Sequence, residues 1–351
     1  MKRILKILAI LALCAGIYVA GVLVYGTVTD YNPPDLMAIT PVGEAAGSAD
    51  SLFTFVTWNI GYTGQGARAD FFYDGGKQVI ASDADVTAYR DGITQFLSSE
   101  TDVDVFFLQE VDSSARRSYY VNQPAHFLAE MPDYLYAFAS NYRVQFVPMP
   151  LFNPMGKVIS GLSTFSRLPA DGFERHAFDT QFSWPTRIFF LDRCFLTHRT
   201  PLSNGRDLVC INTHCSAYDT SGTMVSREIE RIMSFAEAEY QKGNYIVIGG
   251  DWNQCPPGYT PLDTNLSYNE HILRDDQLPQ GWRWEADINV YTNRKLSTPY
   301  NSSSYKSVID HFVVSPNLET VLIEGIDLDF AFSDHQPVKL TVKLKDVDLN
   351  D

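Results

Sequence analysis

Basic residues are scarce in this 351-residue sequence, which has 27 Lys and Arg against 42 Asp and Glu and a formal net charge of −15. Three of the bases, Lys2, Arg3 and Lys6, lie in the first 29 residues, which contain no acid, so 24 bases face 42 acids in the rest of the chain. Sequence-independent binding of nucleic acid normally requires an excess of basic residues, because phosphate contacts dominate it. The composition therefore argues against a nucleic-acid substrate, although a local basic patch could oppose the average charge.

Cysteine is also scarce, and none of the five cysteines belongs to a C-x-x-C pair. This absence argues against the common zinc and redox motifs. Cys194 and Cys210 lie on two apolar runs joined by P-L-S-N-G-R, so they could face one another across a hairpin. The sequence leaves open whether these two residues, Cys215 and Cys255 are buried free thiols or form disulfides.

One long apolar run is present at the N-terminus, where residues 7–26 are uncharged and almost wholly apolar. Twenty helical residues span about 30 Å, the thickness of the bilayer hydrocarbon core. The apolar core of a cleaved signal peptide is shorter, and no A-x-A pattern closes this run. We predict an uncleaved membrane anchor, with secretion after signal cleavage as the alternative. The bases before the run predict a cytoplasmic N-terminus and a catalytic part on the non-cytoplasmic side.

The rest of the chain contains no repeat, no low-complexity tract and no second linker after Ser51. Residues 1–29 are therefore predicted to be the anchor or signal segment. Proline and glycine interrupt residues 30–50 without apolar periodicity, which is typical of a linker. Residues 51–347 are predicted to form one catalytic domain.

Alternating strand-like and helix-like segments predict an α/β architecture with buried sheets. Two stretches, 83–100 and 224–240, carry apolar residues at helical spacing. The predicted strands are apolar and rich in β-formers, and they cover residues 53–59, 103–109, 208–214, 245–250 and 308–315.

Polar residues with acidic, amide or imidazole side chains follow several of the apolar runs, at the point where the chain leaves the core. They are Asn59 in T-W-N-I-G-Y, Glu110 in L-Q-E-V-D, His214 in I-N-T-H, Asp251 and Asn253 in G-G-D-W-N, Asp310 in V-I-D-H, and Asp334 and His335 in F-S-D-H-Q-P-V. Each one alone could be a cap or turn residue. Together they indicate a site, because open α/β sheets place their sites at the ends of strands.

Elementary chemistry limits what these side chains can do. A carboxylate directly after a buried strand, such as Glu110, must be exposed, paired or bound to a cation, since burying it unpaired is costly. Asp251 and Asn253 are two residues apart and can converge on one ligand. An Asp–His pair suits general-base chemistry, because the carboxylate fixes the imidazole tautomer and stabilises its cation.

The combination of L-Q-E-V, G-D-W-N and S-D-H-x-P resembles the endonuclease/exonuclease/phosphatase superfamily, which includes pancreatic deoxyribonuclease, neutral sphingomyelinases and inositol-polyphosphate 5-phosphatases. The resemblance extends in order from about residue 52 to residue 345. It implies a four-layer α/β sandwich, with two mixed β-sheets packed face to face and flanked by helices. It also implies one active site at the sheet ends that uses Mg²⁺, with Mn²⁺ or Ca²⁺ as alternatives.

The resemblance also implies a role for each residue at the metal site. Glu110 would be the principal metal ligand, Asn59 would contact the metal or a phosphate, and Asp334 would support the metal site. These oxygen-bearing side chains are the type that a hard dication prefers.

The remaining matched residues would act on the substrate. His335, oriented by Asp310, would assist the attacking water or stabilise the transition state, and Asp251 is the competing candidate for the base. Asn253 would hold a phosphate oxygen. His214 would bind a phosphate oxygen or help to protonate the leaving group.

We therefore predict a divalent-metal-dependent phosphoester hydrolase that acts on a small or lipid phosphoester outside the cytoplasm. Its partners would be the phosphoester and, through the N-terminal helix, the membrane. An exported metal-dependent endonuclease and a non-catalytic binding protein are the alternatives. The sequence leaves the identity of the phosphoester, the metal and the oligomeric state open.

Overall fold

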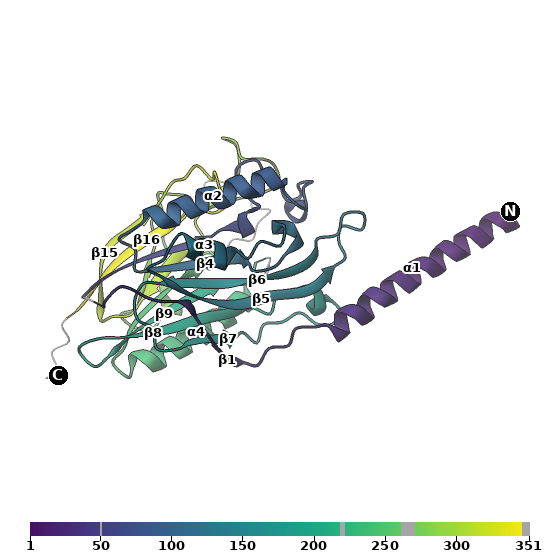
Figure 1. The fold of residues 1–351 in the computed structure, drawn as a ribbon. Coiled ribbons are helices and arrows are strands. Elements are labelled where there is room, and N and C mark those ends of the chain that lie inside the picture. The colour runs from purple at the N-terminus through teal and green to yellow at the C-terminus, as the bar shows by residue number, and fades with distance from the viewer. Residues whose placement is uncertain (50, 218–221, 261–270, 346–351) are drawn as a thin grey trace.

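A computed structural model describes residues 1–49, 51–217, 222–260 and 271–345. A long N-terminal helix leads into a domain built around two seven-stranded β-sheets (Figure 1). The predicted C-terminal limit of that domain, residue 347, lies outside the described residues.

The first sheet is mixed, and its central strands β9 and β10 run parallel. The remaining neighbours are antiparallel. In spatial order, its strands are β1 (Leu36–Ile39), β7 (Phe173–Ala177), β8 (Cys194–Pro201), β9 (Asp207–His214), β10 (Tyr245–Asp251), β14 (Asp310–Val314) and β11 (Arg283–Glu285).

The second sheet is also mixed, with one parallel pair, β3 and β4. In spatial order, its strands are β15 (Leu318–Gly325), β16 (Val338–Leu344), β3 (Leu52–Asn59), β4 (Val105–Asp112), β6 (Gly156–Ser166), β5 (Leu135–Val147) and β2 (Val42–Gly43). A separate two-stranded sheet pairs β12 (Asn293–Arg294) with β13 (Lys306–Ser307).

The main core lies between the two large sheets. Phe55 and Phe107 of the second sheet belong to one buried cluster with Cys210, Val247 and Phe312 of the first. These residues are fully buried, as expected where two sheets pack face to face through interdigitating side chains.

Helices cover the outer face of each sheet (Figure 1). Ile93 of α2 (Asp83–Ser99) and Phe127 of α3 (Gln123–Ala129) pack in one cluster with Trp58 of the second sheet. Ile232 of α4 (Thr223–Tyr240) packs with Ile211 of the first sheet. Helix, sheet, sheet and helix form four layers, so the predicted fold class is confirmed.

Short 3-10 helices lie in the connecting loops. They are η1 (Gly61–Thr63), η2 (Phe72–Asp74), η3 (Arg116–Ser118), η4 (Thr186–Phe189) and η5 (Asp275–Gln277).

The N-terminal helix α1 (Lys2–Val28) is long and apolar enough to cross a membrane, with a mean hydropathy of 2.7 over its best 18-residue window. None of that window is buried against the domain. The following segment, predicted as a linker, contains β1 and β2, which pair with β7 and β5 and form one edge of each large sheet. Its polypeptide therefore contributes one strand to each large sheet.

Four cysteines of the domain, Cys194, Cys210, Cys215 and Cys255, are buried, and none of them forms a disulfide. The idea that Cys194 and Cys210 face one another across a hairpin is wrong. In the β8–β9 pair Cys210 lies opposite His198, four residues beyond Cys194. The register of the hairpin therefore keeps the two thiols apart.

Candidate active site

Three of the predicted residues lie side by side at one end of the first sheet. Asp251, the last residue of β10, is in register with His214 at the end of β9 and with Asp310 at the start of β14. All three are buried. Strand pairing alone therefore aligns an imidazole and two carboxylates in one row.

The second sheet contributes Asn59 and Glu110 from the ends of two parallel strands. Asn59 closes β3 and pairs with Gln109 of β4. The pairing of β4 with β6 shifts between Leu108 and Val111, and Glu110 within this irregularity has a φ of +52°. A bulge of this kind redirects a side chain, and the left-handed backbone of a non-glycine residue is a strain often found at functional sites.

Asp334 and His335 precede β16 and are held against the same edge. Ser333 Oγ donates to the main-chain oxygen of Asn59 at 2.8 Å, and the main-chain nitrogen of His335 donates to Ser333 Oγ at 3.1 Å. Asp334 Oδ1 lies so close to Gly61 that a Cβ there would approach it to 2.8 Å. A glycine with a φ of +49° is therefore required beside this carboxylate.

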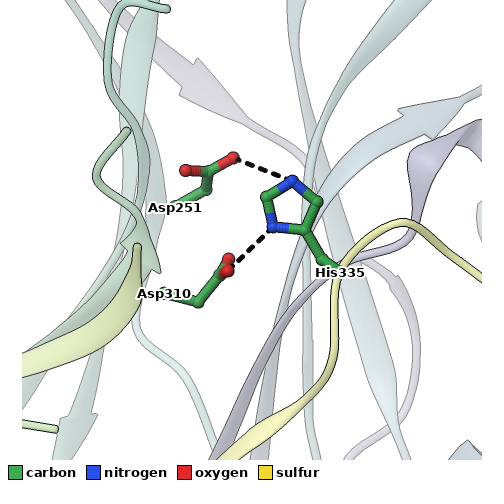
Figure 2. A group of neighbouring side chains, drawn as sticks. All are labelled: Asp251, Asp310 and His335. Atoms are coloured by element: carbon green, nitrogen blue, oxygen red, sulfur yellow. Dashed lines mark hydrogen bonds and ion pairs between the residues drawn. The ribbon is translucent and has the colours of Figure 1, made fainter. Parts of the chain in front are cut away.

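Asn59 and His335 connect the two sheets. Asn59 Nδ2 donates to Asp251 Oδ2 at 2.9 Å and to Glu110 Oε1 at 3.3 Å. His335 Nδ1 lies 2.8 Å from Asp310 Oδ2, and its Nε2 lies 3.7 Å from Asp251 Oδ2 (Figure 2). One ligand atom from each of Asp251, Asp310 and His335 lies within 4.8 Å of the others, a spacing that could also hold a cation.

The two remaining predicted residues border this group. His214 Nε2 lies 3.5 Å from Asp251 Oδ2. Asn253, with a φ of +51°, donates its main-chain nitrogen to Asp251 Oδ1 at 2.9 Å and its Nδ2 to the main-chain oxygen of Cys215 at 2.9 Å. All eight predicted side chains therefore come together at one edge of the sandwich.

The carboxyl groups of the site differ in acidity. Burial raises the pKa of Glu110, raises that of Asp334 to about 7 and raises that of Asp310 to about 6. Burial also acts to raise the pKa of Asp251, but His335 and His214 outweigh it, so the pKa of Asp251 is lowered. Asp251 is therefore the carboxyl group that ionises most readily.

The two histidines of the site differ as well. Burial acts to lower the pKa of His335, but Asp310 and Asp251 outweigh burial and raise the pKa well above its usual value. Burial lowers the pKa of His214 to about 3. At neutral pH the site therefore presents a protonated imidazole, a neutral imidazole and an ionised carboxylate next to one another.

Sequence reasoning missed Asn293, whose Nδ2 lies 2.9 Å from His335 Nε2. This residue begins the two-residue strand β12, in a segment with no long apolar run that would have indicated a strand end. It touches the imidazole nitrogen that faces the site.

Sequence reasoning also missed a hydrogen bond between the sheets beneath the site, formed by Gln109 and Asn212, although both residues belong to the motifs L-Q-E-V and I-N-T-H. Gln109 Nε2 donates to Asn212 Oδ1 across the two sheets at 2.8 Å, and both side chains are fully buried.

Arg117 is a further residue that was not predicted, and its charge acts on Glu110 of the site. It forms a buried ion pair with Asp112 at 3.0 Å and stacks 3.7 Å from the ring centroid of Tyr62.

Solved structures share the fold at low sequence identity. An endonuclease/exonuclease/phosphatase from Beutenbergia cavernae is 17% identical, with a TM-score of 0.58, and the match covers 84% of this chain and 72% of that chain. An endonuclease/exonuclease/phosphatase family protein from Leptotrichia buccalis is 14% identical, with a TM-score of 0.55, and the match covers 83% of this chain and 100% of that chain. TDP2 from D. rerio, in complex with a single strand DNA product, is 15% identical, with a TM-score of 0.51. That match covers 84% of this chain and 100% of that chain.

No curated protein matches the chain. The model of the Endonuclease/Exonuclease/phosphatase family matches residues 56–335, from β3 to His335. That range contains every residue of the candidate site described above. Because the match covers most of the chain, this protein belongs to the endonuclease/exonuclease/phosphatase family, whose enzymes generally hydrolyse phosphoester bonds.

Proposed function

We propose that the protein is a divalent-metal-dependent hydrolase of a small or lipid phosphoester, attached to a membrane by α1 with its catalytic domain on the non-cytoplasmic side. The observation that carries this proposal is the contact of Asn59 with both Asp251 and Glu110, beside the His335–Asp310 pair. These contacts join an acid–base group to a carboxylate suited to binding a cation. Metal-assisted hydrolysis of a phosphoester uses both.

The metal would be held by Glu110, Asn59 and Asp334. The donor set fits, since carboxylate and amide oxygens suit Mg²⁺, and Mn²⁺ or Ca²⁺ use the same ligand types. Glu110 and the buried Asp334 raise the local negative charge, and Glu110 contributes to the raised pKa of Asp334. A bound dication would relieve this repulsion, polarise a phosphoryl oxygen and offset the charge that develops on it.

The cluster of Asp251, Asp310 and His335 is the competing place for a cation. We assign it to proton chemistry instead, because His335 Nδ1 already lies at hydrogen-bond distance from Asp310. An imidazole held in this way has a fixed tautomer and orientation.

Asp251 would accept the proton of the attacking water. Its two oxygens are fixed by the side chain of Asn59 and the main chain of Asn253, and its pKa is lowered, so it is ionised at neutral pH. His335, protonated and oriented by Asp310, would donate a hydrogen bond to a phosphate oxygen as negative charge develops there.

Asn253 and His214 would bind the phosphate. One hydrogen of the Asn253 amide is directed to the main-chain oxygen of Cys215, which fixes the amide and leaves its second hydrogen for a phosphate oxygen. Neutral His214 would donate through a ring nitrogen to a phosphate oxygen or to the leaving group. These contacts would hold the reacting phosphorus in line with the water.

The acidic average charge and the apolar helix α1 support a small or lipid phosphoester as the substrate. An endonuclease is the second candidate, supported by the shared fold with TDP2 from D. rerio, which was solved with a single strand DNA product. Repulsion between the acidic domain and a polyanion favours the first candidate.

The test is hydrolysis by the full chain in detergent across sphingomyelin, a glycerophospholipid, inositol polyphosphates, a bis-aryl phosphodiester and plasmid DNA. Each assay is run with Mg²⁺ and with a chelator, beside Glu110→Gln, which keeps the size of the side chain but removes its charge. We expect metal-dependent cleavage of a lipid or small phosphoester, and a loss of about 10²–10³-fold in the variant, as is typical when one preorganised electrostatic group is removed.

The other results would separate the alternatives. Nicking of plasmid DNA without cleavage of the small substrates would favour the endonuclease. Folded protein that cleaves none of the substrates would favour a binding protein. Full activity in Glu110→Gln would remove Glu110 from the metal site.

A further inference from the structure

Large apolar side chains are exposed on two loops at one end of the domain. In the loop between β5 and β6, Phe152 is 98% exposed and Leu151 is 54% exposed; in the segment between β7 and β8, Trp184 is 57% exposed. We call this set the apolar rim, and it consists of Met149, Leu151, Phe152, Phe182, Trp184 and Phe190. Contiguous exposed apolar side chains usually mark a surface that contacts a partner or a membrane.

The segment between β7 and β8 is attached to the C-terminal end of α1. Trp184 Nε1 donates to Thr27 Oγ1 at 3.1 Å, and Arg187 forms an ion pair with Asp30 at 2.8 Å. Gly26 packs so closely on Ile188 that a Cβ would approach its Cδ1 to 2.9 Å. The end of the apolar helix is therefore fixed against one half of the apolar rim.

The loop between β5 and β6 is connected to the same region. Tyr142 of β5 donates its hydroxyl to the main-chain oxygen of Phe189 at 3.2 Å. Phe189 packs against a buried cluster that includes Val147 and Met155, the residues on either side of this loop. Figure 1 shows the loop on the side of the domain from which α1 departs, whereas β15 lies at the opposite end.

The candidate active site lies at the same end of the domain. In the antiparallel β4–β6 pair, Asp112 is in register with Ser160, close to where β6 begins after the exposed loop. Glu110 lies two residues before Asp112, so the catalytic end of β4 and the exposed loop share one end of the second sheet. A partner surface that contacts the apolar rim would therefore face the end of the domain that carries the candidate active site.

We propose that the apolar rim inserts into the headgroup region of the bilayer that α1 spans, and that this contact turns the active site toward lipid phosphoesters. The inference rests on the membrane attachment under the proposed function. Aromatic side chains with one apolar and one polar part favour the membrane–water interface, and the rim combines such a residue, Trp184, with aliphatic and phenyl groups. A lipid surface is the occupant because the rim continues directly from the end of the spanning helix.

The test measures the depth of single added tryptophans in the full chain, reconstituted into phosphatidylcholine vesicles. Three variants are compared with the parent protein: Phe152→Trp in the rim, Ile10→Trp in α1, and Val321→Trp on the exposed strand β15 at the opposite end. Each is measured in ordinary lipid and in lipid whose acyl chains are brominated near the headgroup, which quenches tryptophan within contact distance. The emission that each substitution adds to the parent spectrum is the readout.

We expect brominated lipid to remove most of the added emission at positions 10 and 152 and to leave that at position 321 unchanged. Quenching at position 10 without quenching at position 152 would overturn the rim contact and leave the anchor standing. Quenching at neither position would show that α1 is not in the bilayer, and the inference would fall with the anchor. Equal quenching at positions 152 and 321 would mean that the domain adsorbs without orientation, which also overturns it. Because none of these readouts depends on turnover, they are independent of whether the site is catalytic.

Discussion

His335 at the candidate site and His198 in β8 are both buried, yet their pKa values shift in opposite directions. Burial lowers the pKa of His198 to about 3. Its ring stacks on that of Phe173 with the ring centroids 5.0 Å apart, and its Nε2 has no hydrogen-bond partner among the described residues. His335 meets the same burial, but Asp310 and Asp251 outweigh it. The neighbouring carboxylates, and not the depth of burial, therefore make a buried histidine useful for proton chemistry.

The largest effect is expected from a variant that removes the imidazole of the site. We expect His335→Ala to lower kcat by about 10²–10⁴-fold, the usual contribution of a positioned proton-transfer group or charged donor. Affinity for the metal should change little, since His335 is assigned to the transition state. Steady-state kinetics and metal titration by calorimetry measure the two quantities separately.

A weakened affinity for metal, with normal turnover once the metal is saturating, would contradict this assignment. It would move His335 to the metal site and favour a cation bound among Asp251, Asp310 and His335. His198→Ala is the matched control, because it removes a buried imidazole away from the site. It should change stability and leave kcat of the folded protein unchanged.

A smaller effect is expected from Asp310→Asn, which preserves the shape of the side chain and removes the charge that raises the pKa of His335. The imidazole would lose its fixed orientation, and we expect a loss of about 10–100-fold in kcat, the range for residues that orient a functional side chain. The pH profile of kcat is the discriminating measurement. If the variant lost activity without any shift of its pH profile, Asp310 would have only a structural role.

The smallest expected effect concerns His198 and the stability of the fold. Its folded pKa of about 3 lies below the ordinary value of 6.5, so the unfolded chain binds the proton first as pH falls. Its contribution to stability is therefore complete above pH 6.5 and is lost progressively as pH falls toward 3. Between pH 7 and pH 5 this amounts to about 1–2 kcal/mol.

Denaturant unfolding of the full chain in detergent, followed by tryptophan fluorescence, would measure this loss. His198→Leu should be less sensitive to acid over this interval than the parent, whatever its absolute stability at pH 7. A variant with the same dependence on pH as the parent would show that His198 is accessible to protons in the folded state.

Much of the fold was predictable because the inner strands are locally distinct. The predicted strands 53–59 and 208–214 correspond to β3 and β9, and the predicted helices 83–100 and 224–240 correspond to α2 and α4. These elements combine strong apolar periodicity with burial on a defined face, which is the signal that sequence patterns carry best.

Features that depend on tertiary pairing were not predictable. The strands β1 and β2 are only four and two residues long, too short to show a period of their own, and they pair with β7 and β5. Asn293 reaches His335 through a loop whose path no local pattern describes. The separation of Cys194 and Cys210 follows from the register of a hairpin, and a shift in register changes which residues face one another.

The buried pair of Gln109 and Asn212 has a mechanical consequence. Asn212 accepts from Gln109 and also donates to the main-chain oxygens of Leu108 and Ser163, so it is tied to three places on the facing sheet. Any slide of one sheet over the other would break these bonds in a dry interior, where an unpaired polar group is costly. These hydrogen bonds therefore resist any change in the offset between the two sheets, and with it any change in the distance between Asn59 and Asp251 at the candidate site.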